Sequence, residues 1–189
     1  MVNGHQLTIG WYVDDLKISH KDPEVVTNVI NVLEQKFGSM NTTRVQSHTY
    51  LGMDFKIGNG KVELMMESYL KECIVSFGEA INTSATTPAT KVLMKVDENS
   101  RELDERRKQI FHHVVQKMLH ICKRTRIDLQ LVIGFLCTRV RCPTEQDWGK
   151  LRRMLQYVSG TLKIARIISI ENFDDMLSLS MWLMGPIEI

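Results

Sequence analysis

The chain has 189 residues, of which 43% are hydrophobic and 24% are charged, as in a globular protein of one domain or two small ones. No stretch is long and apolar enough to span a membrane, and Gly4, His5 and Gln6 stand where a secretory signal would be apolar. The four cysteines form no C-x-x-C pair, and His112 and His113 lack the spacing of zinc ligands. We therefore expect an intracellular protein with reduced thiols and no membrane partner.

The formal net charge of +2 is unevenly distributed. Residues 1–100 carry a net charge of −3, residues 101–170 carry +9, and residues 171–189 carry −4. A basic segment of this kind is typical of a surface that binds a polyanion. A solvated helix surface rich in lysine and arginine explains the same charge, and charge alone favours neither reading.

The first predicted element is a β-hairpin over residues 7–19. Apolar side chains alternate along this stretch and are interrupted at residues 12–15, which we expect to form a tight turn. Asp14 and Asp15 then lie at the tip of the hairpin. The turn lacks the Asn-Gly pair that is typical of two-residue hairpin loops.

A helix and a second hairpin are predicted next. "DPEVVTNVINVLEQKFG" has an N-cap at Asp22 and a stop at Gly38. The apolar face of this helix contains Val26, Val29, Ile30, Leu33 and Phe37. "YLGMDFKIGNGKVELMM" alternates as two strands, residues 51–57 and 62–66, joined by a turn at residues 58–60.

A change of pattern follows this second hairpin. Residues 68–77 indicate a short helix that ends at Gly78. Residues 79–104 lose all periodicity and are rich in serine, threonine and alanine. They are predicted to form a linker and are the best candidate for a subdomain boundary.

The remaining chain is predicted to be helical. Helical spacing begins near residue 105, a second helix is expected over about 128–139, and a third begins at Thr144 and ends at Gly160. Asp147 occupies the capping-box position of that third helix. Its apolar face contains Trp148, Leu151, Met154, Leu155 and Val158, and its other faces carry Lys150, Arg152 and Arg153. The fold class is therefore α+β, with two hairpins and helices followed by an all-helical part.

The adjacent aspartates are the candidate chemical site. Two carboxylates on one turn repel each other, and a divalent cation relieves that repulsion. Mg²⁺ prefers such oxygen ligands, and two ions about 3.5–4 Å apart can stabilise the attacking and leaving oxygens of a phosphoryl transfer. For the dipeptide alone, an ordinary exposed Asp-Asp turn is the better explanation.

A series of motifs adds to the aspartate pair. "YVDD" between apolar strands resembles the catalytic hairpin of reverse transcriptases. "HTYLGMDF" resembles the segment that opens the primer-grip hairpin in copia-type retrotransposons, "MMESYLKECIVSFG" resembles their next helix, and "TTPA" their Thr-Pro linker. The later "T-R-x-D", "P-T-x-x-D-W" and "Y-x-x-G-T" steps resemble the thumb and connection of that family. The resemblance covers nearly all of residues 6–163.

The resemblance implies a domain order. Residues 1–78 would be a partial reverse-transcriptase palm, residues 79–104 a linker, and residues 105–170 a helical thumb and connection. Residues 171–189 would be the truncated start of an RNase H-like strand, in which Met184 stands where the first RNase H aspartate would be.

The resemblance also implies roles for individual residues. Asp14 and Asp15 would be the catalytic, metal-ligating pair for Mg²⁺ or Mn²⁺. The family's third aspartate lies on an earlier strand, and residues 1–11 contain no acidic residue. We therefore expect an incomplete metal site. Tyr12 would lie behind the primer terminus.

Two further groups are expected to contact nucleic acid. By resemblance, Leu51, Gly52 and Met53 would form the primer grip. By charge, Lys150, Arg152 and Arg153 would contact the phosphate backbone.

Two functions are consistent with these features. The first is a fragment of a copia-type RNA-directed DNA polymerase, inactive alone because the fingers and the first palm aspartate are absent. Its partners would be an RNA/DNA primer-template and the rest of the Pol polyprotein, in the cytoplasm where the family's particles assemble. The alternative is a non-enzymatic retrotransposon remnant that at most binds nucleic acid through its basic helical half. A third reading, an unrelated α+β domain with a chance YVDD, is disfavoured by the ordered series of motifs.

Overall fold

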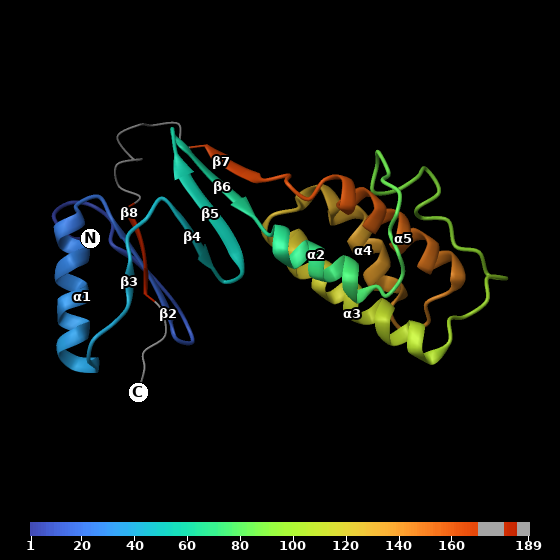
Figure 1. The fold of residues 1–189 in the computed structure, drawn as a ribbon, viewed down its shortest axis with the longest axis horizontal. Helices are drawn as coiled ribbons and strands as arrows, with labels where there is room; N and C mark the ends of the chain where they lie inside the picture. Colours follow the sequence, from blue (N-terminus) through green and yellow to red (C-terminus); the bar gives the residue numbers. More distant parts are fainter. Residues whose placement is uncertain (170–179, 185–189) are drawn as a thin grey trace. The chain divides into compact units, whose positions relative to one another are not determined.

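The computed structural model describes residues 1–169 together with the backbone of residues 180–184. Helices and strands are mixed, as the α+β assignment predicts, and the chain forms two compact units (Figure 1). The first unit contains residues 1–63 and the chain from Ile167 onward, and the second contains Leu64–Arg166. The boundary between Glu63 and Leu64 falls within the strand Lys61–Met65. The predicted linker at 79–104 lies inside the second unit.

The first unit is built on the predicted aspartate hairpin. Strands β1 (Thr8–Tyr12) and β2 (Asp15–His20) pair antiparallel, and the two-residue turn between them confirms the predicted position. The sheet order is β1-β2-β8-β3, in which β3 is Thr42–Thr43 and β8 is Ser180–Met184. The expected strand at 181–183 therefore exists and pairs with β2, whereas residues 170–179 and 185–189 of the expected RNase H-like segment lie outside the described residues.

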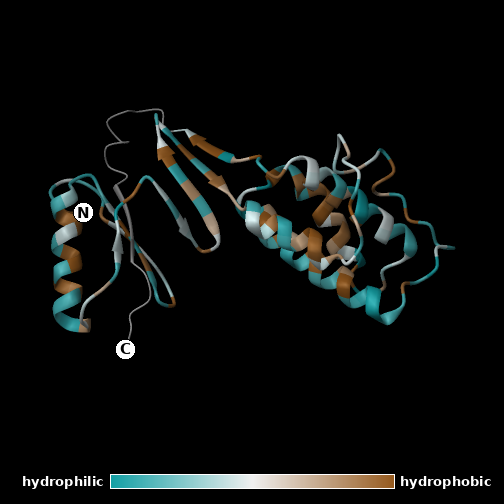
Figure 2. Cartoon of the chain, in the orientation of Figure 1, coloured by the Kyte–Doolittle hydropathy of each residue, from teal (hydrophilic) through white to brown (hydrophobic). Residues whose placement is uncertain are grey.

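Helix α1 (Pro23–Phe37) packs on this hairpin. Its N-cap and C-terminal stop are as predicted, because Asp22 accepts a hydrogen bond from the Glu24 amide and Gly38 adopts a φ of 91°. Hydrophobic and hydrophilic residues alternate along it (Figure 2). The core between helix and hairpin is formed by Ile18, Val26, Ile30 and Met40. Phe37 is 61% exposed but lies on the predicted face, since it lines one apolar hollow together with Val29 and Leu33.

The second hairpin differs from its prediction at its first strand. Strands β4 (Ser47–Tyr50) and β5 (Met53–Gly58) pair antiparallel, and Leu51–Gly52 form the turn between them. Leu51 therefore does not belong to the strand, and β4 was not predicted. Strand β6 (Lys61–Met65) follows the predicted Asn-Gly turn, and the sheet order is β4-β5-β6-β7, where β7 is Arg166–Ser169.

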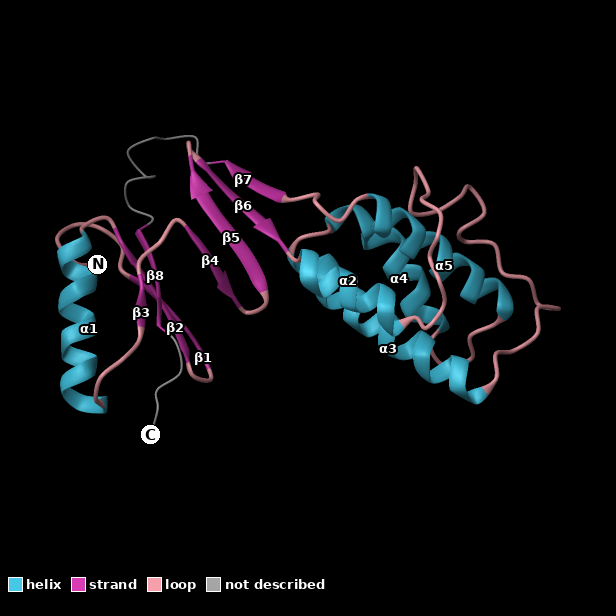
Figure 3. Cartoon of the chain, viewed as in Figure 1, coloured by secondary structure: helices cyan, strands magenta, loops and turns pink. Residues whose placement is uncertain are grey.

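The second unit is mainly helical (Figure 3). Its elements are α2 (Glu67–Ser76), α3 (Glu105–Arg124), the short 3₁₀ helix η1 (Ile127–Leu129), α4 (Gln130–Arg139) and α5 (Glu145–Gly160). Thr144 and Asp147 form the predicted capping box. The predicted apolar face of α5 is confirmed, because its five members are all buried.

Residues 79–104 form a long loop between α2 and α3, without helix or strand, as predicted (Figure 3). None of the helices in residues 1–169 combines the length and the apolar run that a membrane span requires.

Candidate functional site

The tip of the first hairpin holds the paired aspartates in a strained turn. Tyr12 and Asp15 are opposite each other in the register, so Val13 and Asp14 form the turn. Val13 has a φ of 51°, a left-handed conformation that is an outlier for a β-branched residue. The Trp11 indole donates a hydrogen bond of 2.7 Å to the Val13 carbonyl oxygen. Strain of this kind costs about 1–3 kcal/mol and occurs preferentially at functional sites.

Asp14 is exposed at the rim of an apolar hollow of about 370 Å³. The hollow lies between the hairpin and α1, and its lining includes Trp11, Val13 and Leu33. Trp11 is 78% exposed and Val13 is 72% exposed. The face predicted from the alternation at residues 7–13 is therefore only partly covered by α1.

Asp15 belongs to the other side of the hairpin, where β4 and β5 pack. Burial raises the pKa of Tyr50, and the nearby Asp15 carboxylate raises it further. The Tyr50 hydroxyl would lie 3.8 Å from a Cβ atom placed on Gly10, so it packs closely against β1. The two adjacent carboxylates therefore border different surroundings, one apolar and one beside a buried phenol.

Lys17 joins the two hairpins on the Asp15 side. Its Nζ lies 3.6 Å from the centroid of the Phe55 ring and 5.2 Å from that of Tyr50. Burial lowers the Lys17 pKa to about 8. The His48 ring stacks on Phe55 with its centroid 5.2 Å away, and burial and the Lys17 charge lower its pKa, opposed by a hydrogen bond to the Val45 carbonyl.

This cluster of Lys17, His48, Tyr50 and Phe55 was not predicted. The one sign of this cluster in the sequence is Lys17, a charged residue between Leu16 and Ile18 in an apolar strand. Alternation places Lys17 on the same face as Asp15. That face packs against a separate hairpin, and alternation within one strand does not reveal which segment will pack there.

The expected primer-grip residues lie at the turn of the second hairpin. Leu51 and Gly52 have φ values of 51° and 72°, the two positive values of a type I′ turn, and Met53 begins β5. Tyr50, directly before them, contacts the aspartate hairpin. Tyr12 is 59% exposed beside the aspartates.

The three basic residues expected to contact phosphate form contacts within the chain. Lys150 donates a 2.7 Å hydrogen bond to the Lys95 carbonyl, and burial lowers its pKa. Arg152 forms an ion pair with Glu79, and Arg153 donates a 3.1 Å hydrogen bond to the Thr87 hydroxyl. All three thus bind the loop at 79–104, at positions on α5 away from its buried face.

Two of the sequence motifs meet in one buried network. Arg126 is fully buried and binds the Asp128 carboxylate through Nε and Nη2, at 2.9 and 2.8 Å. It also donates to the carbonyl and hydroxyl oxygens of Thr161, and the Tyr157 hydroxyl donates to Asp128 at 3.0 Å. The "T-R-x-D" and "Y-x-x-G-T" motifs therefore each supply part of this network.

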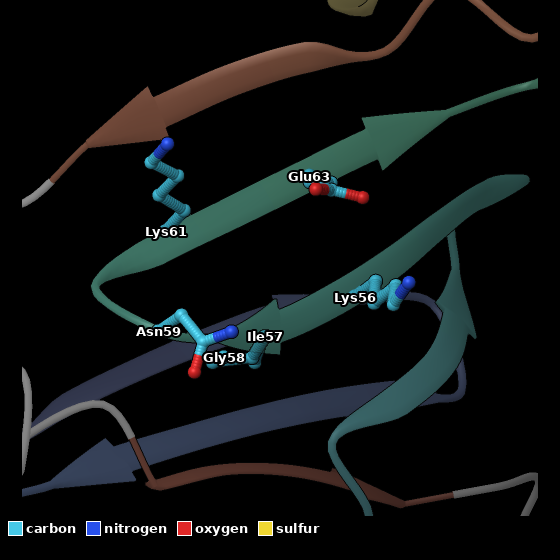
Figure 4. A pocket seen from close by; sticks show the side chains of 6 residues that line it. All are labelled: Lys56, Ile57, Gly58, Asn59, Lys61 and Glu63. Carbon is cyan, nitrogen blue, oxygen red and sulfur yellow. The ribbon is translucent and has the colours of Figure 1, made fainter.

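The described residues provide a limited set of metal ligands. Across residues 1–169, no three histidine, cysteine, aspartate or glutamate side chains are close enough together to hold a metal ion. Asp14 and Asp15 are hard oxygen ligands of the type that Mg²⁺ prefers, so their chemistry fits that ion, but they are two ligands only. A further hollow, of about 270 Å³ at the β5–β6 turn, is lined by Lys56, Lys61 and Glu63 among others and does not include either aspartate (Figure 4).

Comparison with known proteins relates the chain to mobile genetic elements. It is similar in sequence to Pol polyproteins of transposons. It is 23% identical over 171 residues to the Retrovirus-related Pol polyprotein from transposon RE1 of Arabidopsis thaliana, covering 87% of this chain and 11% of that protein. It is 24% identical over 169 residues to the Transposon Ty1-ER2 Gag-Pol polyprotein of Saccharomyces cerevisiae, covering 82% and 10%.

A shorter relative is the Uncharacterized mitochondrial protein AtMg00810 of Arabidopsis thaliana, 24% identical over 151 residues, covering 80% of this chain and 60% of that protein. The chain thus spans about a tenth of the length of the polyproteins that it matches. No protein-family model and no solved structure matches the chain.

Proposed function

We propose that this chain is part of a reverse transcriptase, the RNA-directed DNA polymerase of a copia-type retrotransposon, and that residues 1–63 contribute to its polymerase site. The packing of the two hairpins carries the proposal. Tyr50, at the end of β4, contacts both Gly10 and Lys17 of the aspartate hairpin. The Leu51–Gly52 turn follows Tyr50 directly. A carboxylate turn and a primer-binding turn need this kind of mutual support to act on one primer end.

Each residue then has a defined task. Asp14 and Asp15 would hold Mg²⁺ or Mn²⁺, which when bound stabilises the charge that develops during phosphoryl transfer. Tyr12 and the turn at Leu51, Gly52 and Met53 would orient the primer end. The buried Tyr50 and Lys17 contacts keep the two turns in register, since a 1 Å misplacement of reacting groups can cost about 10²-fold in rate.

The 189 residues alone are not expected to extend a primer. Two adjacent carboxylates on one turn supply too few ligands for two ions at the spacing of about 3.5–4 Å that in-line transfer requires. The nucleotide also needs a positioning surface, and positioning contributes about 7–11 kcal/mol in favourable reactions. The partner is therefore the remainder of the Pol polyprotein, as the relatives suggest.

Primer extension tests the proposal. The isolated chain is assayed on poly(rA)·oligo(dT) with Mg²⁺ or Mn²⁺ and should be inactive. A fusion that places the preceding Pol residues of the RE1 polyprotein before Met1 should extend the primer. Asp14→Asn should abolish this extension, whereas Asp22→Asn should preserve it, because asparagine caps a helix as well as aspartate does.

The controls separate the outcomes. Robust extension by the isolated chain would refute the ligand argument. An active fusion that tolerates Asp14→Asn would refute the assignment of the aspartates. A fusion that folds and binds primer-template but never extends it would favour the non-enzymatic remnant.

A further inference from the structure

The loop between α2 and α3 runs along the outer face of α5. We call residues 79–104 the strap. Near its start, Glu79 accepts a 2.9 Å hydrogen bond from the Trp148 indole, and Thr83 accepts one of 2.7 Å from Gln156. Farther along, the Asp97 amide donates to the Gln146 side chain at 3.0 Å. The strap therefore follows α5 toward its C-terminal end and returns to its N-terminal end.

The strap covers the cations of that face. Arg152 pairs with Glu79, Arg153 binds the Thr87 hydroxyl, and Lys150 binds the Lys95 carbonyl. Only one of these three partners carries a negative charge. A cation is attracted by Coulomb's law to an oxygen that carries a full negative charge more strongly than to a neutral one, so anionic phosphate oxygens would be better partners for Lys150 and Arg153.

The central part of the strap is held weakly. No residue from Ala80 to Val92 is buried, and the buried apolar anchors lie outside this stretch, at Leu93 and Leu103. Its contacts to α5 are side-chain hydrogen bonds at exposed positions. Segments with few buried apolar contacts open at low free energy while the rest of the fold persists.

We propose that the strap is a displaceable cover over a phosphate-binding face of α5, and that the backbone of a nucleic acid displaces it to reach Lys150, Arg152 and Arg153. This inference rests on the proposed function, since it identifies a nucleic-acid surface of the same polymerase. For Lys150 and Arg153, opening replaces neutral oxygens with phosphate oxygens. It also frees the Arg153 Nε atom, which is buried and has no partner among the described residues.

A reversible disulfide tests the cover. A Cβ atom on residue 160 would lie 3.0 Å from the Ser84 Cβ. Disulfide-bonded Cβ atoms lie about 3.5–4.5 Å apart, so a small movement of the exposed strap suffices. The probe is the full chain carrying Ser84→Cys and Gly160→Cys, with the exposed Cys142 changed to serine. Its binding to a labelled RNA–DNA duplex is titrated by fluorescence anisotropy at several salt concentrations, oxidised and reduced.

The locked chain should bind the duplex at least 10-fold more weakly at low salt than the reduced chain. Each phosphate contact contributes about 0.9 to the slope of log K against log salt, so losing three contacts should make the slope shallower by about 2–3. Changing Lys150, Arg152 and Arg153 together to glutamine should reduce the affinity of the reduced chain to that of the locked chain. The exposed pair Lys36→Gln and Lys56→Gln is the matched control and should leave the difference between oxidised and reduced chains intact.

Equal affinity and slope in the two states would overturn the proposal. Equal competition by poly-glutamate and by unlabelled duplex would overturn the assignment of a nucleic acid as partner. Circular dichroism of the locked chain verifies that it remains folded. Primer extension by the fusion is an independent readout, so a fusion that works while the lock has no effect refutes the strap inference and leaves the proposed function standing.

Discussion

At the scale of single residues, the cationic side chains of Lys17 and Arg126 have partners that the fold brings to them. Lys17 lies inside an apolar strand, with its ammonium over the Phe55 ring. Arg126 is completely buried in a network that it shares with Asp128 and Thr161. Asp128 is two residues from Arg126, but Thr161 is 35 residues away and Phe55 is far from Lys17 in the chain, so these environments followed only from the fold.

Lys17 should make stability depend on pH. Its pKa falls from 10.5 to about 8 on folding, so the protonated amine opposes folding. The folded chain binds fewer protons than the unfolded chain between pH 8 and about 10.5, so this opposition is complete below pH 8 and fades as the pH rises through that range. We expect Lys17→Met to raise the free energy of unfolding at pH 7 and to have a smaller effect at pH 10, as measured by urea titration.

The exposed Lys56 on β5 provides the control for that measurement, because Lys56→Met should change stability little at either pH. If Lys17→Met instead destabilises the chain at pH 7, the attraction of the ammonium to the two aromatic rings exceeds the penalty of its burial.

Arg126→Met should destabilise the second unit strongly. Removing one partner of a buried ion pair typically costs about 3–5 kcal/mol, and about 3 kcal/mol is expected here because the Asp128 side chain remains 32% exposed. Lys71→Met is the matched control, since Lys71 pairs with Glu67 on the surface of α2 and such pairs contribute under about 0.5 kcal/mol. If the two variants lose the same free energy of unfolding in urea titrations, the Arg126 network does not stabilise the second unit as argued.

At the scale of elements, local signals predicted helices better than strands. The capping residues Asp22 and Thr144 mark the starts of α1 and α5, because a cap acts within a few residues. The β4–β5 turn was missed because Leu51 stands where a type I′ turn usually has asparagine, and because alternation continues through it. Strands β3 and β8 pair with distant partners, and no local pattern specifies such pairing.

Trp148 tests the packing of α5. It is 4% exposed, stacks on Phe77 with ring centroids 4.4 Å apart, and lies below the Arg107 guanidinium. Trp148→Ala should lower the free energy of unfolding by about 3–5 kcal/mol. Trp148→Phe should cost less, since it loses mainly the hydrogen bond to Glu79. A urea-measured loss well under 1 kcal/mol for the alanine variant would show that this helix face is wrongly assigned.

At the scale of the whole molecule, the chain is two compact units and about a tenth of the polyproteins that resemble it. The order of motifs indicated the retrotransposon relationship, which the relatives support. The unit boundary within β6 was not predicted, because composition changes at the polar strap and not at the strand where the two units separate. The aspartate turn was predicted within residues 12–15, and the structure places it at Val13 and Asp14. The contacts of this hairpin with Tyr50 required the structure.

The proposal that the two hairpin turns contact the primer end is tested most directly by locating that end on the first unit. In the fusion of preceding Pol residues to this chain, a primer carrying 4-thiothymidine at its 3′ end is irradiated on its template, and the cross-linked residues are mapped by mass spectrometry. We predict cross-links at Tyr12 and at Leu51–Met53, at the turns of the two hairpins. Cross-links confined to α1 or to the strap, in a fusion that extends the same primer, would contradict the proposal.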